Sequence, residues 1–303
     1  MILKSRYPWR MFYPVASVLL LFGLWSGYWY YAQAQARSEV KFRRERLAAS
    51  GHVLSCQQES WGGYPFRFEF TCRKPLLRFA NGSEASAGSL LVLAQAYDPK
   101  HIVGLAEGPT HLQLSNGRRI EASHDRAIAS LVFDSEDLPR ISAVVSNLSV
   151  DGFFMVKHLE LHGRPVSGGA SDIAVDGESI NLADAAKPPL PIDQIQLRAK
   201  LTQPGELVIQ SMLLRSGAVE LTGSGVLSLD EAHRPTGNIN ATTNDLEGLL
   251  GAAGPYLEIN DKERATLRAL LALLGKGAST TISARNGELF IGPVKAANLD
   301  PLF

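Results

Sequence analysis

The chain has 303 residues, of which 45% are hydrophobic and 20% are charged, and its 30 basic side chains balance 30 acidic ones. This composition predicts a folded protein rather than a disordered one. A formal net charge of zero, without a basic stripe interleaved with aromatic residues, also argues against nucleic acid as a partner.

The N-terminal segment has the length and composition of a membrane-spanning helix. Residues 12–31 are uncharged and mostly apolar, and about 20 residues at 1.5 Å each cross the hydrocarbon core of a bilayer. Aromatic side chains mark both ends of this span, at Trp9, Phe12 and Tyr13 and again at Trp25 and Tyr28 to Tyr31. We therefore predict a cytoplasmic N-terminus over 1–11, a transmembrane helix over 12–31 and a water-exposed continuation over 32–50.

A cleaved signal peptide is the competing interpretation, because Lys4, Arg6 and Arg10 resemble its basic leader. No small-x-small cleavage site follows the apolar run directly, which favours a retained anchor. More basic residues follow the span than precede it, so the positive-inside count alone does not decide the orientation. Long domains translocate largely regardless of charge, and we expect the C-terminal domain to be exported.

The only two cysteines, Cys56 and Cys72, have a spacing that suits two neighbouring strands. Turn-forming residues over 62–65 separate the two candidate strands. Apolar residues then alternate with polar ones and place Cys72 on the apolar face of a strand, in the series Phe66, Phe68, Phe70, Cys72. We predict a disulfide worth about 3 kcal/mol, of the kind that persists in periplasm-like compartments. Two unrelated buried thiols are the alternative.

Beyond Leu76, short alternating runs separated by turn signals predict antiparallel β structure. Asn116-Gly117 and Asn286-Gly287 each lie between two such runs, and we predict type I′ hairpins there. A proline-rich run near 187–191 cannot pair in a ladder, and it divides a first β half, 51–186, from a second, 187–303.

Two helices are predicted in the second half. Asn244 and Glu247 resemble a capping box for a helix over 245–253. A second helix, over 261–274, has leucines at helical spacing and ends at Gly275. We expect one or both to pack on the sheet.

The sequence has no recognisable catalytic site. His158, Glu160 and His162 lie on the same side of a predicted strand and offer two nitrogens and a carboxylate to a metal. Because Leu159 and Leu161 take the opposite, apolar face, a solvated surface is the favoured interpretation. The sequence contains no nucleophile elbow, phosphate-binding loop or zinc-protease motif. We therefore expect a protein that is not an enzyme and has no catalytic residues, cofactor or metal.

One block of residues resembles a known family. It consists of Trp61, Gly62, Gly63, Tyr64, Pro65, Phe66, Phe68 and Phe70, set between Cys56 and Cys72 soon after the membrane anchor. This block resembles the hallmark of domain of unknown function 2125, a family of uncharacterised bacterial envelope proteins. The C-terminal third, including Leu221 to Asp230 and Asn286 to Gly292, resembles AsmA-like proteins more loosely.

The resemblance implies an elongated, curved antiparallel β-sheet, in the form of a groove or an open sandwich. It also implies a protein held at the bacterial inner membrane, with its C-terminal domain in the periplasm. The family has no established catalytic residues to carry over.

Two functions remain open at this point. The first is a lipid-binding or lipid-transport factor for envelope maintenance, with phospholipid in an apolar groove. The second is a structural or scaffold subunit that binds an envelope protein and uses its apolar face as a closed sandwich core.

Overall fold

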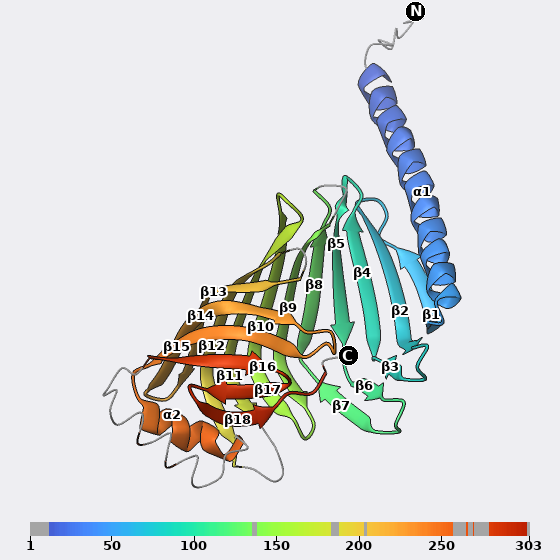
Figure 1. The fold of residues 1–303 in the computed structure, drawn as a ribbon. Helices are drawn as coiled ribbons and strands as arrows, with labels where there is room; N and C mark the ends of the chain where they lie inside the picture. Colours follow the sequence, from blue (N-terminus) through green and yellow to red (C-terminus); the bar gives the residue numbers. More distant parts are fainter. Residues whose placement is uncertain are drawn as a thin grey trace, which may run out of the picture.

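The computed structural model describes residues 12–134, 138–182, 188–202, 205–256 and 279–301, together with residues 265 and 269. A long N-terminal helix, α1 (Phe12–Ala49), extends beyond one end of a large β-sheet (Figure 1). The predicted membrane-spanning segment and its predicted continuation are thus one unbroken helix. It is long and apolar enough to cross a membrane, and almost all of its first half is exposed.

The rest of the described chain is mainly β. The first strands are β1 (Val53–Gly62), β2 (Arg67–Arg78), β3 (Glu84–Ser86), β4 (Ser89–Gln95), β5 (Asp98–Glu107), β6 (Thr110–Gln113), β7 (Arg119–Ser123), β8 (Arg126–Val132) and β9 (Arg140–Val150). The remaining strands are β10 (Phe154–Val166), β11 (Ala170–Leu182), β12 (Leu190–Leu201), β13 (Leu207–Ser216), β14 (Val219–Leu229), β15 (Pro235–Thr243), β16 (Ser279–Arg285), β17 (Glu288–Ile291) and β18 (Val294–Asn298). A short helix, α2 (Leu246–Ala253), and a 3₁₀ turn, Gly254–Tyr256, follow β15.

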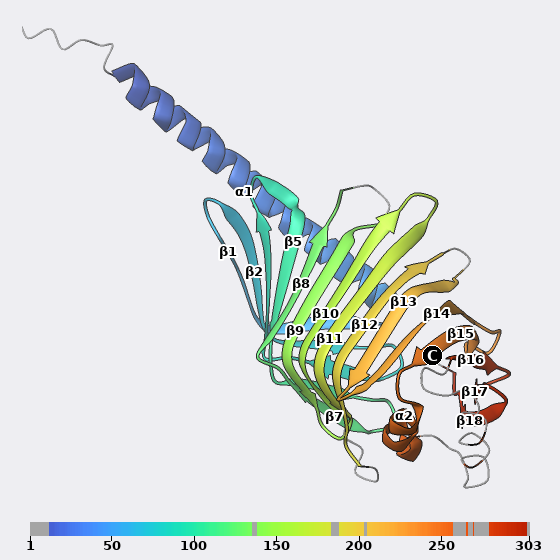
Figure 2. The same ribbon diagram turned by 90° about the vertical axis from the view of Figure 1, so that its left-hand side faces the viewer.

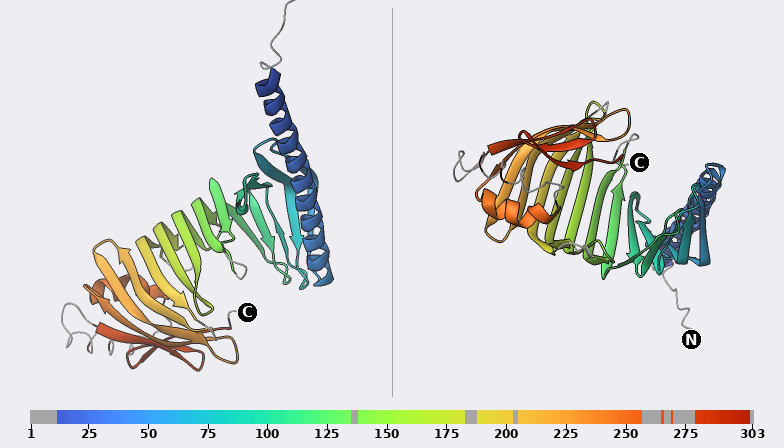
Figure 3. Two further views of the ribbon diagram at one scale, coloured as in Figure 1. Left: turned by 90° about the horizontal axis from the view of Figure 1, so that it is seen from above. Right: turned by 60° about the horizontal axis from the view of Figure 1, so that its bottom comes forward.

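The strands form one antiparallel sheet in which most chain neighbours are also spatial neighbours. From β8 to β18 each described strand pairs with the next. Nearer the N-terminus the sheet divides, because β2 pairs with β4 at one end and with β3 at the other. Figures 2 and 3 show the strongly curved sheet, with α1 near one end and β15–β18 with α2 near the other.

The sheet continues through the predicted division of the domain. β11 and β12 pair along most of their length, from Ser171↔Leu201 to Leu182↔Leu190. The predicted β halves, 51–186 and 187–303, therefore contribute to one sheet. The prediction that the proline-rich run cannot pair was wrong at its end, because Leu190 and Pro191 belong to β12 and lie opposite Leu182 and Asn181. The predicted helix over 261–274 lies almost wholly outside the described residues.

Two local predictions were wrong. The helix cap of α2 is Asp245, whose carboxylate accepts the Gly248 N–H at 3.0 Å, whereas Asn244 binds the edge of β14. Asn116-Gly117 does not form a two-residue turn: only Gly117 has a positive φ, and the Leu114 N–H donates to the Arg118 carbonyl around a three-residue loop.

The prediction of a type I′ turn at the other Asn-Gly pair is confirmed. Asn286 and Gly287 have φ values of 55° and 75°, and the residues on either side of them, Arg285 and Glu288, are paired across the strands. Positive φ at both central residues is the mark of the type I′ turn.

A transverse crease crosses the sheet from β1 to β12. Lys74, Asn147 and Ser179 lie within strands yet have φ values near 50°, and the regular pairing skips a residue at their positions. Residues other than glycine rarely adopt such φ values, which here reverse the side-chain alternation. We call the part of the sheet on the side of the β1–β2 turn above the crease, and the other part below it. A Cβ on Gly177 would contact both Leu159, above the crease, and Ile180, below it, so these two side chains share a face.

Because the alternation reverses at the crease, one face of the sheet stays apolar on both sides of it. Above the crease, one row of paired residues runs from Phe70 through Val92, Gly104, Ala129, Ala143, Leu161, Val175, Leu197, Met212 and Gly223 to Ala241. We call this side of the sheet the apolar face. The opposite face is apolar from β4 to β9 and becomes polar from β10 onward, with Glu160, Asp176 and Gln196 in one row.

Candidate functional site

The hairpin between β1 and β2 holds the N-terminal helix against the sheet. Two indole N–H groups of α1 donate to carbonyls of this hairpin, Trp25 to Pro65 at 2.9 Å and Trp29 to Arg67 at 3.0 Å. The Tyr28 hydroxyl donates to the Ala96 carbonyl at 2.8 Å, in the neighbouring turn between β4 and β5. These bonds fix both the rotation and the height of the helix on the sheet.

Trp29 is the centre of this contact. Its side chain is only 3% exposed, although the helix around it is largely exposed. Its ring stacks on Phe68 of β2, with centroids 5.7 Å apart, and meets the Tyr64 ring edge to face at 5.2 Å. Since Phe68 is on the apolar face, α1 covers that face over β2, next to the edge strand β1.

The glycine at the hairpin turn is required by space as well as by conformation. Gly63 has a φ of +96°, and a Cβ there would lie 2.4 Å from the Arg67 carbonyl oxygen. Any other side chain would therefore collide with backbone in a left-handed conformation that favours glycine. The turn next presents Tyr64, Pro65 and Phe66.

Below this contact the helix covers a disulfide. Cys56 and Cys72 are bonded, with a Cα–Cα distance of 5.4 Å, and the bond spans the crease between β1 and β2. Arg44 of α1 lies over the Phe70 ring at 5.5 Å, forms a 2.5 Å ion pair with Glu59, and approaches the Cys56 sulfur at 3.6 Å. The predicted disulfide is present and forms part of the helix-docking surface.

At the far end of the sheet, α2 covers the apolar face. Leu250 of α2 is buried in a cluster with Val294 and Ala296 of β18, against Leu289 and Ile291 of β17. Among the described residues, α1 and α2 are the two α-helices that pack on this face, and each lies near one end of it.

Between these helices the apolar face has an exposed band. Leu161, Ile141 and Leu201 are 39–41% exposed on the described surface. A hollow of about 260 Å³ opens beside them, lined mainly by Leu138, Pro139, Ile141, Leu161, Pro165 and Ile173. An exposed apolar surface of this kind makes the band the candidate binding surface of the described sheet.

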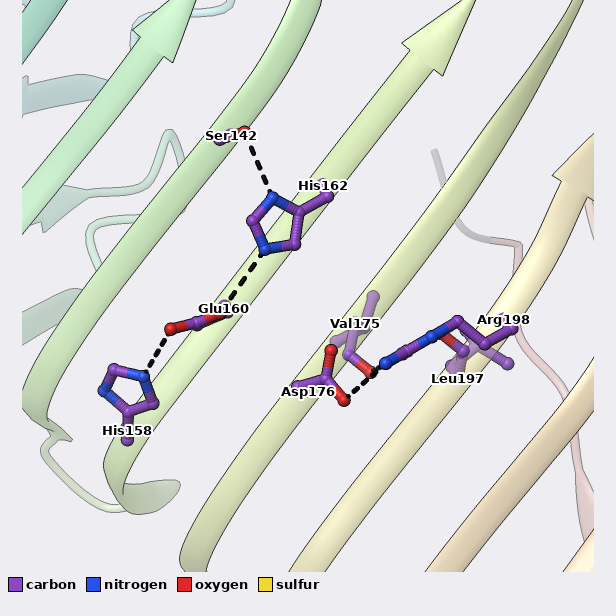
Figure 4. Close-up of polar contacts among 8 residues, drawn as sticks. All are labelled: Ser142, His158, Glu160, His162, Val175, Asp176, Leu197 and Arg198. Carbon is purple, nitrogen blue, oxygen red and sulfur yellow. Dashed lines mark hydrogen bonds and ion pairs between the residues drawn. The ribbon is translucent and has the colours of Figure 1, made fainter.

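The predicted histidine pair lies on the opposite, polar face (Figure 4). His158 and His162 contact different oxygens of Glu160, at 2.8 and 3.3 Å, and His162 also bonds the Ser142 hydroxyl at 3.0 Å. These hydrogen bonds from the two imidazoles lower the pKa of Glu160 below its ordinary value.

The neighbouring strands continue this polar surface. Arg198 of β12 donates to the Asp176 carboxylate at 2.9 Å and to the backbone carbonyls of Val175 and Leu197 at 3.3 and 3.0 Å (Figure 4). Glu160 and Asp176 are thus each held by basic side chains. No group of three or more His, Cys, Asp or Glu residues suited to a metal ion occurs in the part of the chain that the structure describes.

The structure brings most of the family block together but separates one member. Trp61 packs on Phe70 with ring centroids 4.9 Å apart, and Phe68 and Phe70 are buried. Phe66 was expected on the apolar face of the same strand; that prediction was wrong, because Phe66 lies in the turn before β2 and is 69% exposed. The docking roles of Trp25, Tyr28 and Trp29 were not predicted, because their sequence context is that of interfacial aromatics.

Comparison with known proteins identifies the family. A model of domain of unknown function 2125, described as an uncharacterised protein conserved in bacteria, matches residues 29–300. Neither the search of curated proteins nor the search of solved structures found a match. The match begins at Trp29, includes the whole hallmark block and extends over nearly all of the sheet, and the chain belongs to this family.

Proposed function

We propose that the protein is a membrane-anchored, non-enzymatic lipid-binding factor that takes part in lipid transport or envelope maintenance. The observation that carries this proposal is the apolar face, which continues across the strands from β2 to β15 and is exposed at Leu161, Ile141 and Leu201. An acyl chain laid across such a face would remove apolar surface from water, at roughly 25 cal/mol per Å² buried.

The anchor and the disulfide support a place in the bacterial envelope. A helix long and apolar enough to span a membrane leads directly into the sheet, and the bond between Cys56 and Cys72 favours an oxidising compartment such as the periplasm. The inner membrane, with the sheet in the periplasm, is the location that we propose. The looser AsmA-like resemblance of the C-terminal third supports the same function.

Native mass spectrometry of the full chain, purified in mild detergent from its own membrane, tests the proposal. We expect phospholipid to remain bound in the gas phase and to be released when the protein unfolds. Leu161→Glu should reduce this bound lipid, since the side chain lies on the exposed band of the apolar face.

A matched control lies on the neighbouring strand. Ser142→Glu adds the same charge on the opposite face, beside His162 and outside the residues that line the hollow, and it should leave lipid binding unchanged. A chain that carries no lipid, or that carries equal lipid in the two variants, would refute the proposal. A stable protein partner recovered in place of lipid would favour the alternative of a scaffold subunit.

A further inference from the structure

One end of the sheet lies beside the membrane-spanning part of α1. Antiparallel pairing brings the β1–β2, β4–β5 and β10–β11 turns, the end of β8 and the start of β9 to the same end of the sheet, and Figures 1 and 2 show the β1–β2 and β4–β5 turns alongside α1. The N-terminal part of α1 projects beyond them. Any position of α1 in a bilayer therefore also determines the position of these turns.

The hydrogen bonds set the height of this end. The Trp25 indole reaches Pro65, the Tyr28 hydroxyl reaches Ala96, and the Ser26 and Tyr64 hydroxyls are 2.8 Å apart. Trp25 and Tyr28 belong to the aromatic cluster that ends the apolar span, where such side chains occupy the interface of a bilayer. The two turns that they contact must then lie at the same interface.

The turns present large, exposed apolar side chains. Tyr97 is 71% exposed and Phe66 is 69% exposed. Phe133 and Leu138, around the β8–β9 turn, are 39% and 53% exposed. We call these four residues, together with Tyr64, the turn edge.

Turns at the opposite end of the sheet, and the β10–β11 turn farther from α1, present mainly polar residues and glycine. Examples are Asn81-Gly82, Asn116-Gly117 and Asp151-Gly152, and Ser167-Gly168-Gly169 in the β10–β11 turn. Two aromatic residues lie at the opposite end: Phe79 packs edge to face on His52, and Phe153, 36% exposed, lies under the Arg118 guanidinium at 4.7 Å. The most exposed aromatic side chains of the described sheet, Tyr97 and Phe66, lie instead in the turns bonded to α1.

We propose that the turn edge is a membrane-contacting surface, with Phe66 and Tyr97 inserted among the lipid headgroups and upper acyl chains. The occupant of this surface is the bilayer that holds α1, because the turns are bonded to the interfacial residues of that helix. The hollow that Leu138 lines together with Ile141 and Leu161 then opens at the membrane surface. A lipid could pass from the bilayer onto the apolar face without crossing water.

Spin labelling of the full chain in phospholipid vesicles tests this proposal. The native cysteines are joined in a disulfide, so a single added cysteine can be labelled selectively. The test variants are Phe66→Cys and Tyr97→Cys. The control is Met155→Cys, which replaces another exposed apolar side chain, 51% exposed, near the opposite end of the sheet.

Depth is read from the collision rates of the label with oxygen, which concentrates in the bilayer, and with a water-soluble nickel complex. Labels at 66 and 97 should favour oxygen, and the label at 155 should favour nickel. If all three labels favour nickel to the same extent, the turn edge is in water and the proposal fails. The measurement needs no bound lipid ligand, so it can fail or succeed independently of lipid transport.

Discussion

Removal of the Trp29 ring should undock the helix from the sheet. The side chain is 3% exposed, stacks on Phe68 and donates to the Arg67 carbonyl at 3.0 Å. Trp29→Ala should lower the free energy of unfolding by about 3–5 kcal/mol, the usual cost of deleting a large buried aromatic side chain. Trp29→Phe preserves an aromatic ring but loses the indole N–H, so it should cost about 1 kcal/mol from the hydrogen bond and some packing in addition.

Denaturant unfolding of the full chain in detergent, followed by circular dichroism, measures both effects. Tyr31→Ala is the matched control, because Tyr31 is on the same helix but is 67% exposed, and its loss should cost no more than about 0.5 kcal/mol. Equal unfolding midpoints for Trp29→Ala and Tyr31→Ala would refute the inference that Trp29 holds the helix on the sheet.

Three further predictions concern the hairpin and the polar face. Both thiols of Cys56 and Cys72 should resist alkylation until reductant is added, and reduction should cost about 3 kcal/mol because the bond closes a short loop, as denaturant unfolding will show. Gly63→Ala should destabilise the protein strongly, whereas Gly82→Ala, also at positive φ but with nothing within 4 Å of the new Cβ, should cost only about 1 kcal/mol; similar losses would contradict the predicted backbone collision. Because the pKa of Glu160 is lowered in the folded state, its ionised form should stabilise the fold at pH values above the ordinary glutamate pKa, and this stabilisation should be lost as the pH falls through the lower folded pKa. Glu160→Gln should remove that part of the pH dependence of the free energy of unfolding. If the variant unfolds in acid with the same pH profile as the parent protein, the two histidine contacts are not supported.

The anchor and the β class could be predicted because each depends on a local pattern. An uncharged run over 12–31 predicts a spanning helix whatever follows it. Strict alternation up to Cys72 gave the strand and the face of the disulfide, although it extended the strand to Phe66. Phe66 is as apolar as Phe68, so the alternation alone cannot tell them apart. They differ because Phe66 still belongs to the turn that begins at Gly63, whereas Phe68 lies in β2.

The docking of α1 could not be predicted from composition. Trp25 and Trp29 have the sequence context of interfacial anchors, and the same aromatic chemistry also packs on a sheet. The crease had a weak signal in the sequence: apolar residues at Phe154 and Val156 are followed by Leu159 and Leu161, so the alternation changes phase. Asn147 and Ser179 adopt positive φ although neither is a glycine, so the residue type did not predict this conformation.

The two Asn-Gly pairs show how context decides turn geometry. Asn286-Gly287 is flanked directly by paired residues, which matches the two-residue turn that the dipeptide favours. Around Asn116, Leu114 and Arg118 are bonded to each other instead, and the loop is one residue longer. Dipeptide propensity alone does not distinguish these pairings, because the register is set by the strands.

Site-specific photocrosslinking in living cells tests most directly whether lipid occupies the apolar face. A photoreactive phenylalanine at Ile173, which lines the hollow, should form adducts with phospholipid. The same group at Ala174, whose side chain lies on the opposite face beside His162, should form few or none. Lipid adducts at 173 and not at 174 are the result expected of a lipid-binding face. Adducts with a protein at 173, or equal lipid labelling at both positions, would contradict it.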